Sequence, residues 1–363
     1  MLKNENMTTH NVPINKGNYS LDTAEREALF EQYRGEGWEE QYKAYRHNWS
    51  SYPLKQEISD YPLLVDIELS SVCNLKCPMC YTITDEFRKK VQVTKMDWDL
   101  YKKIIDEIDG KVPAIRLSLR GEATLHPKFI EAIQYAKAHG IKEVSMLTNG
   151  SKLALPFFIQ MVEAGVDWIT ISIDGTGKIY ESVRKPLKFD DLLGKIKEIY
   201  NYKKEHNLKR PVIKVQGIWP SILESGLDTY YNIFAPLVDL VAFNPLIDYL
   251  FNDTEIEYLE EFTCPQQYQR LVIGADGLVM KCSNDEENQD VIGNIYHETV
   301  HDVWHGEKMQ AVRDTLLLHH GFLQSEVCRK CYLPRKTEDQ PAQVGDRSFI
   351  VRNYINRSQL IGK

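Results

Sequence analysis

Three cysteines stand close together, directly after an apolar segment that we expect to form a β-strand. Cys73, Cys77 and Cys80 are separated by three and by two residues, and they follow the segment 63–69. Thiols at such short spacing in a loop can bind one soft metal centre, either zinc or an iron–sulfur cluster. A closed zinc site needs four ligands, but the next histidine is only His126 and no fourth cysteine is near. The spacing therefore favours a four-iron cluster that keeps one iron open for a small molecule.

The chain of 363 residues is long enough for one large domain and a smaller one. The segment 1–19 lacks the apolar core of a signal peptide, and no apolar stretch approaches the roughly 18 residues of a membrane span. We therefore expect a cytoplasmic protein without a membrane partner, in which the seven clustered cysteines bind metal rather than form disulfides. The net charge of −8 argues against nucleic acid as a partner.

Strand-like and helix-like segments alternate over most of the chain. The expected strands are 63–69, 114–119, 143–147, 168–173, 212–217 and 238–243. The expected helices between them are 98–108, 128–139, 155–164, 190–206 and 221–234. Strands separated by helices of this length form right-handed βαβ units and a parallel sheet. Six such units predict an α/β fold, a partial (β/α)6 barrel that is TIM-like but open.

Several of these strands alternate apolar and polar side chains. In the first strand Asp66 and Glu68 alternate with apolar neighbours, and the segments 114–119, 168–173 and 212–217 repeat the pattern. Because the apolar face must pack on the outer helices, the polar face points into the barrel. Burial of so many unpaired polar groups would be costly. We therefore expect a polar or water-filled bore that can hold a polar cofactor.

The cysteine motif in this position resembles the signature of the radical S-adenosylmethionine (radical SAM) superfamily, in which C-x3-C-x2-C occupies the loop after the first barrel strand. Met79 stands where the family usually has an aromatic residue, just before the third cysteine. Gly121-Glu122 at the end of the second strand is similar to the Gly-Gly-Glu motif of the family, with Arg120 in place of the first glycine. The resemblance implies that the three cysteines hold a [4Fe–4S] cluster that binds SAM.

The resemblance also implies a set of SAM-binding residues, most of them at the carboxyl ends of the strands. These are, in chain order, Met79, Gly121, Glu122, Asn149, Ser172, Asp174 and Arg184. Gly121 and Glu122 would hold the amino group of SAM, and Ser172 and Asp174 would lie near its ribose. Arg184 would pair with its carboxylate, a role suited to a guanidinium group. For Arg184, an ordinary surface ion pair is the alternative.

Four further cysteines form a second group near the C-terminus. Cys264 and Cys282 flank an expected hairpin with its turn at 275–277, and Cys328 and Cys331 follow at a distance. This pattern resembles the twitch form of the SPASM domain of radical SAM enzymes. The resemblance implies one auxiliary [4Fe–4S] cluster bound by all four cysteines. A four-cysteine zinc ribbon is the alternative.

These features divide the chain into four parts. They are an N-terminal extension 1–60, the radical SAM barrel 61–248, the twitch domain 249–336 and a C-terminal tail 337–363. In the first part we expect a helical stretch at 23–45 that caps the barrel. In the third part we expect the acidic segment 253–261 to be helical. The sequence of the tail is uninformative about its structure.

The resemblance implies a reaction that starts with one electron. A flavodoxin or ferredoxin would reduce the first cluster, cleavage of SAM would give the 5′-deoxyadenosyl radical, and this radical would take hydrogen from a substrate C–H bond. The single auxiliary cluster resembles that of the 2-deoxy-scyllo-inosamine dehydrogenases and, more distantly, the clusters of the anaerobic sulfatase-maturating enzymes. We therefore expect a small-molecule substrate, a sugar or cyclitol whose alcohol is oxidised, with the auxiliary cluster as electron acceptor.

Three alternatives stay open, namely a peptide- or protein-modifying maturase, a redox-neutral epimerase and a non-catalytic metal-binding protein. Oxidation of an alcohol requires a group that takes the hydroxyl proton. Asp248 is the carboxylate nearest to the end of the sixth strand and is the candidate catalytic base. Arg116, Arg120 and Lys214 on the inner face of the strands are alternative proton acceptors or substrate clamps.

Overall fold

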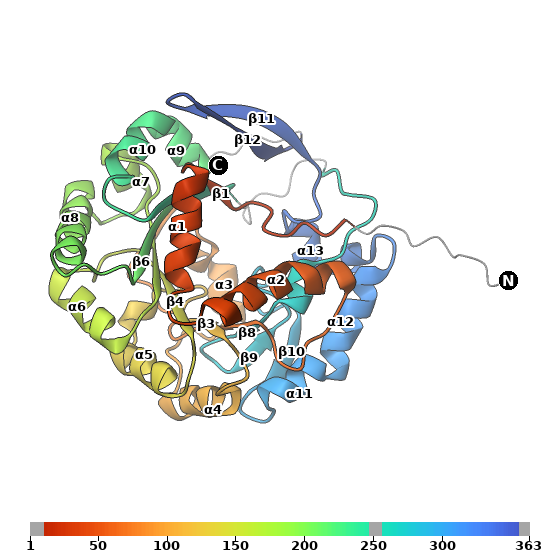
Figure 1. Cartoon of the computed structure of the whole chain (residues 1–363). Coiled ribbons are helices and arrows are strands. Elements are labelled where there is room, and N and C mark those ends of the chain that lie inside the picture. Colours follow the sequence, from red (N-terminus) through yellow and green to blue (C-terminus); the bar gives the residue numbers. More distant parts are fainter. Residues whose placement is uncertain (1–10, 247–255, 356–363) are drawn as a thin grey trace.

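One large β-sheet runs through the part of the chain that the structure describes. The computed structural model describes residues 11–246 and 256–355, and Figure 1 shows helices arranged around the sheet. The ten strands follow the order β1-β7-β6-β5-β4-β3-β2-β8-β9-β10. Within these ranges, no helix is both long and apolar enough to cross a bilayer.

The six expected strands are all present, parallel to one another and side by side in chain order. They are β2 (Leu64–Ile67), β3 (Ala114–Arg116), β4 (Glu143–Thr148), β5 (Trp168–Ser172), β6 (Val212–Ile218) and β7 (Leu240–Asn244). The helices that follow β2 to β5 are α3 (Asp85–Lys90), α4 (Trp98–Ile108), α5 (Phe129–Ala138), α6 (Leu155–Ala164), α7 (Gly177–Val183) and α8 (Phe189–Glu205). Helices α4, α5, α6 and α8 form the outer layer in Figure 1, so the predicted partial barrel is confirmed.

The two faces of the strands differ as the alternation predicts. Apolar side chains such as Val65, Ile115 and Ile169 belong to the main hydrophobic core between strands and helices. On the other face, polar side chains such as Lys214 and Gln216 line a cavity of about 600 Å³ in the bore. The bore therefore contains polar as well as apolar side chains, and its cavity has the size of a small-molecule site.

The helix expected at 221–234 is divided by a glycine. The chain forms α9 (Trp219–Ser225) and α10 (Leu227–Phe234) on either side of Gly226. Gly226 has a φ angle of +81°, a conformation that glycine adopts without strain but that a helix interior does not contain. The expectation of one continuous helix was therefore wrong at this point.

The C-terminal domain continues the sheet of the barrel. β8 (Arg270–Ile273) pairs in parallel with β2, and β9 (Leu278–Met280) and β10 (Val291–Asn294) follow as antiparallel strands. The expected hairpin is thus present, but its first strand is also a seventh parallel strand of the barrel. The other elements of this domain are η3 (Pro265–Tyr268), α11 (Val300–His305), α12 (Glu307–Leu317), η4 (Gly321–Gln324) and α13 (Glu326–Lys330).

The acidic segment 253–261 does not form the expected helix over its described residues, 256–261. Tyr258 instead makes an isolated β-bridge with Arg335. Its ring packs on Phe322 with 5.2 Å between the ring centroids, in a small hydrophobic cluster that also contains auxiliary cysteines. This tertiary packing holds the backbone in an extended conformation and overrides the local helical preference.

The N-terminal extension places two helices across the end of the barrel at which the strands begin (Figure 1). They are α1 (Ala24–Arg34) and α2 (Glu39–Lys55). Arg34 donates two hydrogen bonds of 2.9 Å to the carboxylate of Glu143, the first residue of β4. Phe30 packs edge to face on Trp168, the first residue of β5. The two helices therefore close one end of the bore.

The C-terminal tail forms a β-hairpin for which the sequence gives no prediction. β11 (Thr337–Val344) pairs antiparallel with β12 (Arg347–Tyr354). Val344 and Val351 from the hairpin belong to the main hydrophobic core. The hairpin lies near β1 (Tyr19–Ser20), which pairs antiparallel with β7 at the edge of the sheet (Figure 1). Both ends of the described chain therefore cover the same edge of the barrel.

Candidate active site

The three clustered cysteines lie in the loop between β2 and the short helix η1 (Tyr81–Ile83). The N–H of Cys80 donates to the carbonyl of Cys77 at 3.0 Å, and the Cys80 sulfur lies 3.0 Å from Thr82 Oγ1. Burial raises the pKa of all three thiols, that of Cys77 to about 11, because desolvation disfavours a thiolate. A metal centre offsets this effect because a coordinating thiol is deprotonated. The loop is therefore suited to a cluster.

Gly121 and Glu122 support the cysteine loop from the end of β3. The N–H of Glu122 donates to the carbonyl of Val72 at 2.9 Å. A Cβ atom on Gly121 would lie 2.5 Å from the carbonyl oxygen of Ser70. Any larger residue would displace this loop, so the glycine is required for the close approach of two backbones.

The carboxylate of Glu122 is buried among hydrogen-bond donors. Its Oε1 accepts hydrogen bonds from the hydroxyl groups of Thr124, at 2.6 Å, and Thr148, at 2.8 Å. Its Oε2 accepts one from the N–H of Asn149 at 2.7 Å and has a second lone pair for another donor. The sequence prediction missed the two threonines. In the sequence they are marked only by their position, because Thr124 stands two residues after Glu122 and Thr148 stands directly before Asn149.

Asn149 joins the end of β4 to the cysteine loop. Its Nδ2 donates to Asn74 Oδ1 at 2.9 Å and lies 4.0 Å from the sulfur of Cys73. Met79 lies in the same loop and is half-buried. Glu122, Asn149 and the cysteine loop therefore form one hydrogen-bonded unit, as expected for residues that surround a common ligand.

Arg184 lies beside the cysteine loop rather than on the open surface. Its Nε donates to Asp174 Oδ2 at 2.6 Å, and only 16% of its side chain is exposed. Burial raises the pKa of Cys77, and the nearby Arg184 guanidinium partly offsets this rise. Asp174 Oδ1 also accepts the N–H of Ile218 at 3.0 Å, and Ser172 is buried at the end of β5. The structure thus places Arg184 and Asp174 near Cys77 as a largely buried ion pair, and the role of Arg184 in binding SAM stays a prediction.

Two other residues from the sequence analysis remain, Asp248 and His126. Asp248, the candidate base, is outside the described residues. His126 is buried, its Nε2 lies 3.0 Å from the carbonyl of Met96, and burial lowers its pKa. A buried histidine bound to the backbone is a structural residue.

The four C-terminal cysteines converge on one place around the end of β9 and α13. Burial raises the pKa of Cys264 to about 12 and that of Cys331 to about 11, and the neighbouring thiol of Cys328 adds to both rises. Burial also raises the pKa of Cys282, with further contributions from the other three thiols. Asn284 Nδ2 lies 3.0 Å from the sulfur of Cys331. Asn284 was missed by the sequence prediction, although it stands only two residues after Cys282.

Compact groups of potential metal ligands lie outside the two cysteine sites. Within the described residues, the groups of three potential ligand atoms that all lie within 4.8 Å of one another contain no cysteine.

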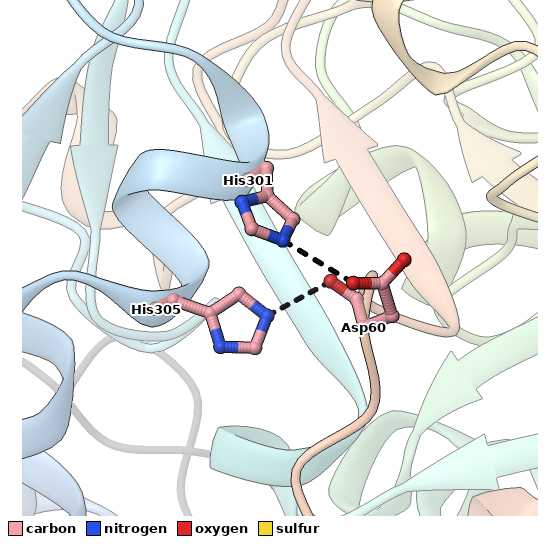
Figure 2. A group of neighbouring side chains, drawn as sticks. All are labelled: Asp60, His301 and His305. Carbon is pink, nitrogen blue, oxygen red and sulfur yellow. Dashed lines mark hydrogen bonds and ion pairs between the residues drawn. The ribbon is translucent and has the colours of Figure 1, made fainter.

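One compact group of potential ligands consists of Asp60, His301 and His305, shown in Figure 2. His301 Nε2 lies 3.3 Å from the carboxylate of Asp60, and His305 Nε2 lies 2.9 Å from its carbonyl oxygen. The indole N–H of Trp304 donates to the carbonyl of Ser59 at 2.8 Å. These contacts attach α11 to the segment before β2, and so attach the auxiliary domain to the barrel.

Arg120 forms a second link between the two domains. Its Nε and Nη2 donate to the two carboxylate oxygens of Glu68 at 2.8 and 2.6 Å, and both side chains are buried. Its Nη1 donates to Asn288 Oδ1 at 2.8 Å, in the loop between β9 and β10. Arg120 therefore has a structural role, and its bonds argue against the role of proton acceptor.

The bore cavity reaches the auxiliary cysteine site. Its lining includes Gln266, Asn284 and Tyr332, each of which stands one or two residues after an auxiliary cysteine. Asn284 also contacts the sulfur of Cys331. A molecule in the bore would therefore lie beside the auxiliary site.

Comparisons with protein families agree with this geometry. The model of the radical SAM superfamily matches residues 67–218, and the model of the iron–sulfur cluster-binding domain SPASM matches residues 264–332. The two matched ranges contain all seven cysteines. A radical SAM domain binds SAM and a [4Fe–4S] cluster, and a SPASM domain binds auxiliary iron–sulfur clusters.

Among curated proteins, the chain is similar to a tungsten-containing aldehyde ferredoxin oxidoreductase cofactor-modifying protein of Pyrococcus furiosus, with 28% identity over 160 residues, or 42% of either chain. It is also similar to the mycofactocin maturase MftC of Mycobacterium tuberculosis, with 28% identity over 133 residues, or 36% of this chain and 32% of MftC. The chain spans less than half of the length of these curated relatives, so the similarity does not transfer their activities.

Solved structures share the fold at low sequence identity. BtrN in complex with AdoMet and 2-DOIA is similar with a TM-score of 0.52 and 17% identity, over 74% of this chain and 92% of BtrN. Streptococcus suis SuiB bound to S-adenosylmethionine is similar with a TM-score of 0.54 and 14% identity, over 80% of this chain and 77% of SuiB. From the family models, the shared fold and the two cysteine sites together, the chain belongs to the radical SAM superfamily, in the branch that carries a SPASM domain.

Proposed function

We propose that this radical SAM enzyme oxidises an alcohol on a small molecule, such as a sugar or cyclitol, and passes the electron to the auxiliary cluster. The observation that supports this proposal is the contact between the bore cavity and the auxiliary cysteine site. When bound, SAM and the two clusters supply the radical that removes the hydrogen atom and the acceptor for the electron. A substrate in the bore would pass its electron over a short distance.

In this proposal the residues of the chain place the cofactors. Cys73, Cys77 and Cys80 bind the first cluster. Oε2 of Glu122 accepts a hydrogen bond from the amino group of SAM, and Arg184 pairs with its carboxylate. The other proposed contacts of SAM are Met79, Gly121, Asn149, Ser172 and Asp174. Among them, Asp174 also fixes the direction of the Arg184 side chain through their 2.6 Å hydrogen bond.

The proposed reaction is a balanced two-electron oxidation. The H–C–OH group of the substrate loses a hydrogen atom to the 5′-deoxyadenosyl radical, a proton to a base and an electron to the auxiliary cluster, and a carbonyl group remains. Asp248 stays the proposed base. Because four cysteines are available for the auxiliary cluster, all of its irons can be ligated, and it would act as an acceptor rather than bind the substrate.

The first electron in the proposed reaction comes from a flavodoxin or ferredoxin. We place the protein in the cytoplasm, because the seven cysteines must stay reduced to bind clusters. Modification of a peptide is the second candidate function, and the similarity to the maturase MftC favours it. The closed end of the bore and its cavity of about 600 Å³ favour a small molecule instead.

The variant Cys282→Ala tests the proposal, with Cys73→Ala as its counterpart. Given a panel of sugars, cyclitols and their acidic derivatives, the wild-type protein should consume one SAM per oxidised product and transfer substrate deuterium into 5′-deoxyadenosine, as measured by mass spectrometry. Cys282→Ala should still cleave SAM but form little product, whereas Cys73→Ala should lose SAM cleavage. Full turnover by Cys282→Ala, or return of deuterium to the product, would indicate an epimerase instead.

A further inference from the structure

The ammonium group of Lys214 faces the bore without a partner of opposite charge. Lys214 lies in the middle of β6 and lines the cavity of about 600 Å³. In residues 11–246 and 256–355, no carboxylate forms an ion pair with its Nζ and no acceptor forms a hydrogen bond with it. Its Nζ lies 5.9 Å from the centre of the Trp168 ring. Glu31 also lines the cavity and favours the charged form of Lys214 through space, but it forms no ion pair with it among the described residues. The ammonium group therefore has no directly bonded carboxylate in the part of the chain that the structure describes.

Basic side chains outnumber carboxylates in the cavity lining, with Lys16, Arg34, Arg46, Arg116, Lys214 and Arg270 against Glu27, Glu31 and Glu143. Arg116 and Arg270 both pair with a single carboxylate, that of Asp66, at 2.8 and 3.2 Å. Two N–H donors on the same wall, Nε of Arg270 and Nε1 of Trp168, are buried without a hydrogen-bond acceptor among the described residues. Buried donors normally have an acceptor, so this wall is suited to a ligand that brings negative charge and oxygen atoms.

Burial and the guanidinium groups of Arg34 and Arg116 lower the pKa of Lys214 to about 8, and the carboxylate of Glu31 offsets this fall only in part. The side chain is therefore still mainly protonated at neutral pH, in a place where its charge is disfavoured. A charged group that remains in an unfavourable environment next to a cavity is typical of a functional site. We therefore expect Lys214 to lower the stability of the protein when no ligand is bound.

Lys214 lies one layer below the proposed SAM site. In the pairing of β5 with β6, Thr170 stands opposite Lys214 and Ser172 stands opposite Gln216. Two residues along a strand span about 6.6 Å. A small molecule bound at Lys214 can span this distance with a few covalent bonds. One molecule can therefore contact both Lys214 and Ser172.

We propose that the substrate carries an anionic group, a carboxylate or a phosphate, which binds between Lys214 and Arg116 in the bore. The C–H bond that reacts then points towards Ser172 and the cysteine loop. An ammonium group and a guanidinium group together bind either oxyanion well, whereas an amino sugar or aminocyclitol cation would be repelled. The anionic class rests on the proposed function, whose substrate it specifies.

Thermal unfolding of the reconstituted protein tests this inference without turnover. Sodium phosphate and sodium acetate are compared with sodium chloride at equal ionic strength. At about ten times its dissociation constant, at least one of the two anions should raise the unfolding midpoint by about 2–3 °C and reach saturation, because a ligand of the native state stabilises it. A response to phosphate alone supports a phosphorylated substrate, and a response to acetate alone supports a carboxylic acid.

The variant Lys214→Met keeps the length of the side chain and removes its charge. We expect it to unfold at a higher temperature than the wild type and to lose the response to the anion. Lys197→Met, from an exposed position on α8, is the matched control and should keep the response. The inference is wrong if the wild type does not respond, if Lys214→Met responds equally, or if Lys214→Met is less stable, which would reveal a structural partner.

The experiments distinguish a failure of the anionic substrate class from a failure of the proposed oxidation. If the anion response is absent but neutral sugars are oxidised, the anionic class is excluded and the oxidation stands. If the anion binds through Lys214 but deuterium returns to the product, the anionic class stands and the oxidation is excluded.

Discussion

At the scale of single residues, we propose that the carboxylate of Glu122 combines a structural role with a role in binding SAM. Its Oε1 accepts hydrogen bonds from two threonines, while its Oε2 accepts one from Asn149 and can accept another. In Glu122→Gln a charge-assisted hydrogen bond to SAM becomes a neutral one, a loss of about 1.5–3 kcal/mol. We expect the dissociation constant of SAM, measured by equilibrium dialysis, to rise about 10- to 150-fold.

Both clusters should still form in Glu122→Gln, which iron analysis can check. The matched control is Glu131→Gln, a change of the same kind at an exposed position of α5. It should leave the affinity for SAM unchanged. An unchanged affinity in Glu122→Gln itself would remove this residue from the SAM site.

The sequence predicts the cysteines and Glu122 because they belong to motifs of fixed spacing. It leaves the role of Arg184 open, because ten residues of separation from Asp174 do not say which way the side chain points. It also cannot show that Lys214 forms no ion pair with any residue that the structure describes. That property depends on Trp168 being its neighbour on β5, and on Asp66 being already engaged with two arginines.

At the scale of secondary-structure elements, the buried pair of Arg120 and Glu68 holds the loop after β9 against the barrel. In Arg120→Met the charge of Glu68 stays buried without its partner, so we expect the free energy of unfolding to fall by about 3–5 kcal/mol. Anaerobic calorimetry can measure this fall. The double variant Arg120→Met/Glu68→Gln should recover part of it, because it removes the isolated charge.

The exposed ion pair of Lys43 and Glu40 on α2 provides the matched control. We expect Lys43→Met to change the free energy of unfolding by less than about 1 kcal/mol, since exposed pairs are screened by solvent. An Arg120→Met protein as stable as the wild type would contradict the structural role of the buried pair.

Local periodicity explains which elements the sequence predicts. Four of the six central strands alternate apolar and polar side chains, and segments of helical period separate all six, so their type and order are confirmed. The pairing of β8 with β2 is not visible in the sequence, because it joins segments that are far apart in the chain. The segment 256–261 and the hairpin of β11 and β12 are shaped by contacts with distant residues such as Phe322, which local patterns do not contain.

At the scale of the whole molecule, the two cysteine groups predict the metal content. Anaerobic reconstitution should give about eight irons per chain, four for each cluster. The variant in which Cys73, Cys77 and Cys80 are all replaced by alanine should keep about four irons and lose all SAM cleavage. Iron analysis and chromatography of 5′-deoxyadenosine measure the two quantities.

A wild-type protein that holds one zinc and no second cluster would contradict the auxiliary-cluster assignment. The surface group of Asp60, His301 and His305 needs a control, because its ligand atoms lie close enough together to take up a stray transition metal (Figure 2). The same metal analysis on His305→Ala distinguishes zinc bound at this surface group from zinc bound elsewhere. Zinc that is lost in this variant was bound at the surface, and zinc that remains was bound elsewhere.

β2 leads directly into the cysteine loop, and β8 follows Cys264 and η3, so two neighbouring strands carry both metal sites. Strands in a sheet lie about 4.8 Å apart, in a register that backbone hydrogen bonds and side-chain burial fix. The distance between the two metal sites, which matters for electron transfer in the proposed reaction, is therefore set by the sheet and not by a hinge. The cap of α1 and α2 is attached mainly through side chains. Selection for a new substrate can therefore change the cap and the bore wall while the relative position of the two metal sites is kept.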